Sequence, residues 1–166
     1  MIQVLEQVAS EIGLIRPGDE PFRLAFGYAC AARVRHLLEE AEVVVCLTVL
    51  DEFVSNGVDD EVLRHSKREV DRLANHHRGS ASINGCGHPA VSATHAVANA
   101  ISGRALQAAS CAAYATVYAD GGYGAVAQRE AFEPEFSWQL NTLQGISARP
   151  SEGMLRPNRC RPSVLR

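Results

Sequence analysis

The side chains best suited to chemistry are four histidines and one cysteine in the middle of the chain. Cys86 is followed two residues later by His88 and seven residues after that by His95, and His76 and His77 precede them. Imidazole nitrogens and a thiolate are favoured ligands of zinc, and three or four of them around one ion would hold a metal. If His88 begins a helix, His95 lies two turns along and shares its face. The segment 76–95 therefore raises the hypothesis of a metal-binding protein or a metal-dependent enzyme.

A structural role for the same residues is the competing interpretation, because their spacing matches no closed zinc pattern. His88 would then cap or line a loop, and His95 would be a hydrogen-bonded residue at a helix interface. We expect this structural role, with no bound metal and no other cofactor, and we retain the metal hypothesis as the alternative.

Two further motifs resemble reactive sites only superficially. Gly-Cys-Gly-His at 85–88 places a thiol beside an imidazole in sequence, but nucleophilic catalysis needs the two groups adjacent in space. Asp-Gly-Gly-Tyr-Gly at 120–124 has the glycines of a phosphate-binding loop, yet no strand is predicted before it. We therefore interpret 120–124 as a turn between helices and assign no catalytic residue.

The elements that would position these groups are predicted to be helices. Residues 1–13 have apolar side chains at helical spacing, and Pro21 suits the first turn of a second helix. No Gly or Pro interrupts residues 28–56, which predicts either one long helix or two helices with a bend. Residues 125–143 are expected to form the last helix, with Pro134 as the point at which it would be interrupted.

Residues 43–50, V-V-V-C-L-T-V-L, are ambiguous between strand and helix. Their β-branched, apolar composition taken alone is typical of a buried strand. Acidic residues flank the segment without a turn signal, and no other strand is predicted that would pair with it. We therefore predict that it is a central buried helix.

Residues 59–78 carry matching signals for a charged helix. Asp59, Asp60 and Glu61 open it, where the helix dipole favours negative charge, and basic residues close it before Gly79. Its predicted inner face consists of Val62, Ser66, Val70, Leu73 and His77.

Residues 80–119 contain one formally charged side chain, Arg104. A sevenfold repeat of small or aliphatic residues begins at 91 and predicts two closely packed helices, broken at Gly103. A membrane hairpin is the competing interpretation, but a spanning helix needs about 20 predominantly apolar residues and this run is rich in Ala, Ser, Asn and Gly. We expect no membrane segment. The predicted seam consists of Val91, Thr94, Ala98, Ile101, Ala105, Ala108, Ala112, Ala115 and Ala119.

Composition and charge limit the classes of partner. The 166 residues are 46% hydrophobic and 21% charged, which fits one globular domain. Residues 147–166 hold five Arg and one Glu, whereas the remainder holds 18 acids and 11 bases, a net charge of -7. An acidic body disfavours nucleic-acid binding and favours a basic protein partner. No secretory signal is apparent, so we expect a cytoplasmic protein in which the five scattered cysteines are reduced and mostly buried.

These patterns together predict an all-α, single-domain bundle of about six helices. The domain is expected to span residues 1–146, followed at 147–166 by a flexible Arg- and Pro-rich tail. Trp138, the only tryptophan, is expected to anchor the core.

Several segments between residues 37 and 143 also carry a family resemblance. They are Cys46-Leu-Thr-Val-Leu-Asp-Glu-Phe53, the helix from Asp59-Asp60-Glu61 to Arg78-Gly79, the alanine-rich segments with His95 and Tyr118-Ala119, and Glu135-Phe-Ser-Trp-Gln139-Leu140. In this order they resemble immunity proteins of bacterial polymorphic toxin systems. The resemblance implies a non-catalytic helical protein that neutralises a toxin by covering its surface, and it transfers no catalytic residue.

We therefore expect a protein partner, with a toxin domain as the leading hypothesis. A structural protein that forms homo-oligomers through the alanine seam is a further alternative. The residues expected at the rim of a partner interface are Asp59, Asp60, Glu61, Glu130, Glu133 and Glu135.

Overall fold

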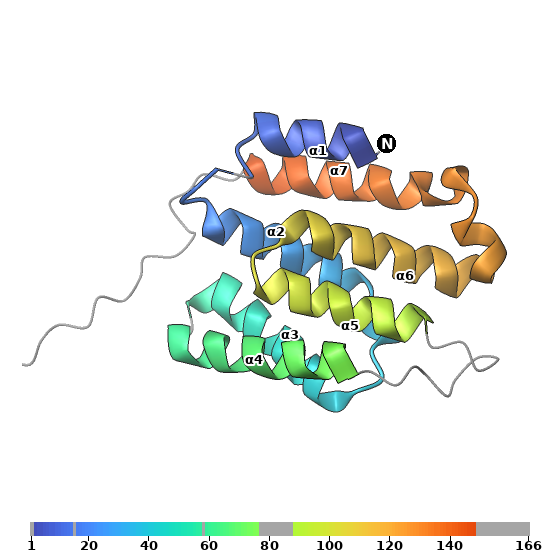
Figure 1. Cartoon of the computed structure of the whole chain (residues 1–166). Helices are drawn as coiled ribbons and strands as arrows, with labels where there is room; N and C mark the ends of the chain where they lie inside the picture. Colours follow the sequence, from blue (N-terminus) through green and yellow to red (C-terminus); the bar gives the residue numbers. More distant parts are fainter. Residues whose placement is uncertain (1, 15, 58, 77–87, 149–166) are drawn as a thin grey trace, which may run out of the picture.

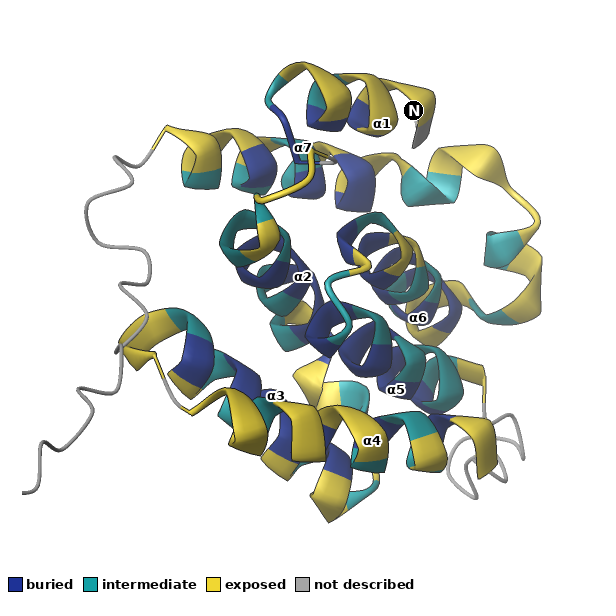
Figure 2. Cartoon of the chain, turned by 60° about the vertical axis from the view of Figure 1, so that its left-hand side comes forward, coloured by how far each residue is buried: buried dark blue, intermediate teal, exposed yellow. Residues whose placement is uncertain are grey.

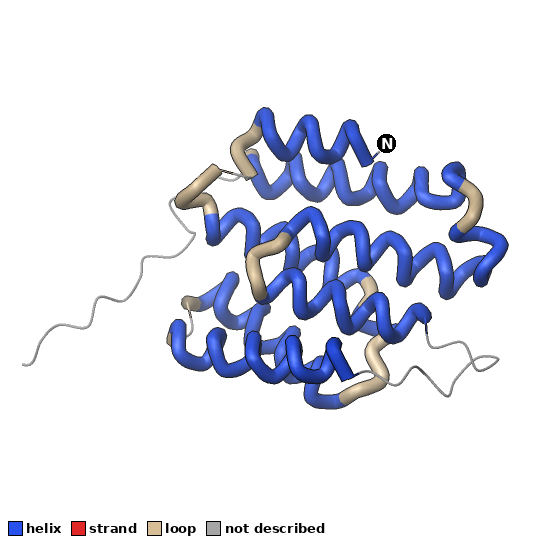
Figure 3. The backbone as a smooth tube through the Cα atoms, viewed as in Figure 1, coloured by secondary structure: helices blue, strands red, loops and turns tan. Residues whose placement is uncertain are grey.

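The computed structural model describes residues 2–14, 16–57, 59–76 and 88–148, and every regular element within these ranges is helical (Figures 1 and 3). The α-helices are α1 (Ile2–Glu11), α2 (Glu20–Arg33), α3 (Ala41–Asn56), α4 (Asp60–His76), α5 (His88–Ile101), α6 (Ala105–Val126) and α7 (Glu133–Ser147), with short 3-10 helices η1 (Arg35–Leu37) and η2 (Arg129–Phe132). The all-α prediction is confirmed. The seven α-helices exceed the predicted number because the run without Gly or Pro is divided between α2 and α3.

The helices are arranged in three layers (Figure 1). The middle layer contains α2, α5 and α6, which all pack against one another. The hairpin of α3 and α4 covers one side of this layer, and α1 and α7 cover the other. Each outer pair therefore contacts the rest of the molecule mainly through α2 or α5.

The alanine-rich sequence forms the centre of the bundle, where α5 lies along α6. Thr94 and Ile101 are buried on α5, and Ala105, Ala108 and Ala112 are buried on α6, as the predicted seam requires. Gly103, at φ 68°, makes the turn between the two helices. The seam is less buried at its two ends, where Val91 is half-buried and Ala119 is exposed.

The middle layer is also close-packed where α2 crosses α5. A Cβ atom placed on Gly27 would lie 3.0 Å from the Cα atom of Ala100 and 3.2 Å from its Cβ atom. Real side chains rarely approach so closely, so this crossing requires a residue without a side chain on α2.

The ambiguous segment 43–50 is helical, as predicted, and lies within α3. Val43, Leu47 and Leu50 are buried against the middle layer. The helix ends at Asn56. Gly57, which follows it, has a left-handed backbone (φ 69°) that turns the chain away, and its N–H donates to the carbonyl of Phe53.

The inner face of α4 is confirmed at its centre and differs at its start. Ser66 and Val70 are buried and Leu73 is half-buried, but Val62, in the first turn, is 42% exposed. His77, the last predicted member of this face, lies outside the described residues.

The end of the domain differs from the prediction of one helix over residues 125–143. Helix α6 consists of two helical segments that meet at a kink at Gly122 (φ 64°, ψ -159°), and the second segment ends at Val126. Helix α7 then begins at Glu133, with Pro134 in its first turn, where a missing backbone N–H costs nothing. The predicted turn between helices at 120–124 thus corresponds to the kink at Gly122, where two helical segments of α6 meet. Residues 149–166, most of the predicted tail, lie outside the described residues.

No helix in the described ranges is long and apolar enough to cross a bilayer.

Candidate functional site

The described histidines of the predicted metal cluster lie on two helices. His76 is exposed at the end of α4, and its Nδ1 lies 2.8 Å from the carbonyl oxygen of Arg72. His88 is the exposed first residue of α5, with its ring centroid 5.1 Å from that of Tyr118 on α6. His95 is half-buried on α5. Local contacts thus account for His76 and His88.

The structure does not test the full metal hypothesis. Among the described residues, no three His, Cys, Asp or Glu side chains gather closely enough to hold a metal ion. His77 and Cys86, two of the five candidate ligands, lie outside these residues, so the site at 76–95 stays a prediction.

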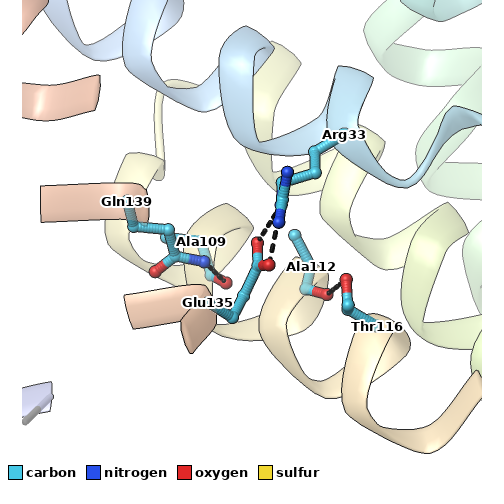
Figure 4. A network of polar contacts seen from close by, with 6 residues as sticks. All are labelled: Arg33, Ala109, Ala112, Thr116, Glu135 and Gln139. Carbon is cyan, nitrogen blue, oxygen red and sulfur yellow. Dashed lines mark hydrogen bonds and ion pairs between the residues drawn. The ribbon is translucent and has the colours of Figure 1, made fainter. Parts of the chain in front are cut away.

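The described residues do contain an ion pair between helices, which the sequence did not predict (Figure 4). Nε of Arg33, at the end of α2, donates to both carboxylate oxygens of Glu135 on α7, at 2.9 Å and 2.7 Å. Glu135 is only 3% exposed, whereas the side chain of Arg33 is 37% exposed. The expectation that Glu135 lies at an exposed rim is therefore wrong, because its carboxylate is directed inward to α2. Glu130 and Glu133 are exposed.

Two neighbours on α7 extend this contact. The guanidinium carbon of Arg33 lies 4.4 Å from the ring centroid of Trp138, an arrangement that favours a cation–π interaction. Gln139 is fully buried, and its amide nitrogen donates to the carbonyl of Ala109 on α6 at 2.8 Å. Trp138 is half-buried: it packs against the core, in line with its predicted role, and its ring also contacts Arg33. The polar groups of this cluster hold α7 to the middle layer.

The described cysteines are poorly suited to nucleophilic chemistry. Burial, and secondarily the negative charge of Glu135, raises the pKa of the Cys30 thiol. Burial is also the main cause that raises the pKa of Cys46 and of Cys111. A thiol rather than a thiolate is expected at each position near neutral pH, and the thiolate is the reactive species. The prediction of buried thiols is confirmed for Cys30 and Cys46, and Cys111 is half-buried.

The predicted rim acids of α4 lie at the surface. Asp59, Asp60 and Glu61 are all exposed. A carboxylate oxygen of Asp59 accepts a hydrogen bond from the backbone N–H of Glu61 at 2.8 Å, which caps the start of the helix. Glu61 also pairs with Arg64 at 3.0 Å. These acids stabilise α4 and remain accessible to a partner.

Figure 2 colours the helices by burial, and α3 carries exposed as well as buried residues. Its outward side is a helical surface near these acids. We call it the α3 outer face, and it consists of Ala41, Val45, Thr48, Val49 and Glu52. These positions share one side of a helix because they are spaced at i, i+4, i+7, i+8 and i+11. Val49 is half-buried and the other members are exposed, with Val45 at 60%. The face offers an apolar surface to solvent, which the sequence reasoning missed when it treated 43–50 as uniformly buried.

A comparison of the chain with protein-family models, curated proteins and solved structures finds no match.

Proposed function

We propose that this chain is a non-catalytic protein-binding module, and specifically an immunity protein that neutralises a toxin domain by covering its surface. The observation that carries the proposal is the α3 outer face, where Val45 is 60% exposed among other exposed residues on the outward side of the helix. Exposed apolar surface beside polar residues is typical of protein contact sites. A partner that covers Val45 would remove this apolar side chain from water.

The charge of the surrounding surface supports a protein partner of opposite sign. Residues 1–146 are acidic, and the exposed acids Asp59 and Asp60 begin α4 directly after the short connection from α3. Complementary charge accelerates association and orients the partners before they dock. A basic toxin domain would be attracted to this end of the α3–α4 hairpin.

The rigidity of the bundle supports a role as a preformed surface. α3 packs on α2 and α4, and α7 is tied to α2 by the Arg33–Glu135 pair. A surface that is already ordered loses little conformational entropy when it binds. The proposed mechanism is therefore occlusion by a preformed helical face, without a covalent step.

The direct test is growth rescue. A domain encoded by a neighbouring gene, chosen because it arrests growth when it is expressed alone, would be placed under an inducible promoter, with the full chain, an empty vector or an unrelated helical protein supplied from a second plasmid. The proposal expects growth only with the chain, and a complex of the two purified proteins by size exclusion with light scattering. Growth arrest despite abundant folded chain would refute the assignment.

A further inference from the structure

We propose that the α3 outer face, together with Val62 of α4, docks a cationic segment of a protein partner. This segment would carry an aliphatic or aromatic side chain between Lys or Arg residues. The inference rests on the proposed function and assigns the surface and the chemistry of the partner that fits it.

A partner can cover the apolar part of the surface without supplying hydrogen bonds to it. Val45 is 60% exposed. The hydroxyl of Thr48, one turn further along, donates to the carbonyl of Val44 in its own helix at 3.0 Å. Because this hydrogen bond is already formed within α3, an apolar side chain can cover Thr48 without leaving its hydroxyl unsatisfied.

The register of the hairpin brings Val62 to the same surface. Sγ of Cys46 lies 3.5 Å from the carbonyl oxygen of Ser66, which fixes the height at which α3 and α4 cross. Three residues connect the two helices, so they run antiparallel. Val49 follows Cys46 by one turn and Val62 precedes Ser66 by one turn, so the two valines lie at the same height on the hairpin. Val62 is 42% exposed and extends the apolar surface beyond α3.

The side chains around this surface carry a net negative charge. Helix α3 carries Glu42, Asp51 and Glu52 and no basic residue. Residues 41–76 contain eight acids and four bases, a formal charge of -4.

Three of the four basic side chains of α4 have acidic partners within the described part of the chain, whereas Lys67 is exposed and is in none of the ion pairs there. Arg64 and Arg68 lie 3.0 Å and 3.8 Å from Glu61, and Arg72 lies 2.6 Å from Glu69. Glu42 and Glu52, which lie before and after Val45 along α3, are in no ion pair among the described residues. Glu42 also interacts electrostatically with Arg72 without forming an ion pair. The net charge of residues 41–76, which surround the apolar surface, is nevertheless negative, and a cationic segment complements it.

A second copy of the chain fits this surface poorly. A two-fold contact through the α3 outer face would place Glu42 and Glu52 of one protomer close to the same acids of the other, and like charges at an interface are unfavourable. The charge thus favours a different, basic protein.

The test uses the full chain and a fluorescein-labelled amphipathic peptide of leucine and lysine, with binding measured by fluorescence anisotropy at low salt. The chain offers a matched pair of variants, Val45→Lys and Val4→Lys. Val4 lies on α1, in the outer layer on the opposite side of the bundle, and is 45% exposed. Both variants add one positive charge at an exposed helical valine, so only the position differs.

We expect Val45→Lys to weaken peptide binding about tenfold or more, because it removes an apolar contact and adds a repelling charge, and Val4→Lys to weaken it by less than about twofold. Glu52→Gln should weaken binding by a smaller factor and reduce its dependence on salt. Circular dichroism would confirm that each variant is folded. Equal affinities for Val45→Lys and Val4→Lys would overturn the proposal.

Other occupants of the surface give different outcomes. If replacing the five Arg of residues 149–166 by Ser tightens peptide binding more than about fivefold, those residues compete for the surface, and the proposal of an external partner is overturned. A dimer of the native chain that Val45→Lys dissociates would overturn it as well.

The growth-rescue assay separates this inference from the proposed function. Rescue by the native chain and by Val4→Lys, but not by Val45→Lys, supports both. Equal rescue by all three leaves the immunity function standing and removes the α3 outer face from the interface. Failure of the native chain to rescue, with the peptide result as expected, leaves the cationic docking surface and refutes the toxin-neutralising role.

Discussion

Replacing Arg33 by methionine should destabilise the protein by about 2–3 kcal/mol. Breaking a buried ion pair by removing one partner typically costs about 3–5 kcal/mol, since the remaining charge is left uncompensated. Glu135 is 3% exposed, but Arg33 is 37% exposed, so water reaches one side of the pair and lowers this cost. The lost contact with Trp138 adds about 0.5–1 kcal/mol.

The companion substitutions separate the charge interaction from packing. Glu135→Gln keeps the shape of the side chain and one acceptor for Nε of Arg33, and it should cost about 1 kcal/mol. In the double variant the uncompensated carboxylate is absent. Its loss of stability should therefore be smaller than the sum of the single losses by about 1–2 kcal/mol.

These differences in the free energy of unfolding are measured by urea denaturation, monitored by far-ultraviolet circular dichroism at neutral pH, for the native chain and the three variants. The exposed pair of Arg64 and Glu61 on α4 is the control, and Arg64→Met should leave the stability almost unchanged. If the loss of stability in the double variant equals the sum of the two single losses to within about 0.5 kcal/mol, Arg33 and Glu135 do not interact energetically, and the reasoning is refuted.

Three further perturbations test the backbone and the core. Gly27→Ala should lower the free energy of unfolding by about 1–2 kcal/mol, because overpacking outweighs the gain in helix propensity, whereas Gly145→Ala, which has open space on α7, should raise it by about 0.5–1 kcal/mol. Gly122→Ala should lower the free energy of unfolding by about 1–3 kcal/mol, because the φ of 64° and ψ of -159° at this position strain any residue other than glycine. Gly124→Ala should not lower it. Thermal melting of the four variants distinguishes the two members of each pair. The raised pKa of Cys30 keeps its thiol protonated when folded, while the unfolded thiol ionises above about pH 8.5. The contribution of the Cys30 thiol to the free energy of unfolding is therefore fully present below that pH, and above it the free energy of unfolding should fall by about 1.4 kcal/mol per pH unit. In Cys30→Ala, the urea midpoint should fall less steeply as the pH rises. Identical pH profiles for the native chain and Cys30→Ala would contradict this.

The central helices were predictable because their signals are local. The sevenfold repeat of small residues is visible in the sequence, and it requires two helices that approach closely. The helical state of 43–50 followed from the absence of a second strand, since one strand alone cannot satisfy its backbone hydrogen bonds. The sequence left open whether residues 28–56 form one helix or two with a bend, because no Gly or Pro marks the break between α2 and α3.

The polar contacts between distant segments could not be read from the sequence. Glu135 looks like an ordinary acid in the first turn of a helix, and its burial depends on Arg33, which is 102 positions away. The exposure of Val45 was predictable in part. Successive residues point about 100° apart on a helix, so the run from Val43 to Val45 cannot lie entirely on one buried side. Which valine faces outward depends on how α3 packs, and this is a property of the fold.

The helical state of residues 43–50 within α3 has a consequence for the unfolded chain. Four valines and a threonine in eight residues form a segment with high β-propensity and no charge, and such segments associate between chains when they are exposed. Acidic residues at 39, 40 and 42 precede the segment, and Asp51 and Glu52 follow it, which are positions where charge opposes such association. Folding into α3 removes the segment from intermolecular strand pairing, so the lifetime of this helix limits how long the protein resists aggregation.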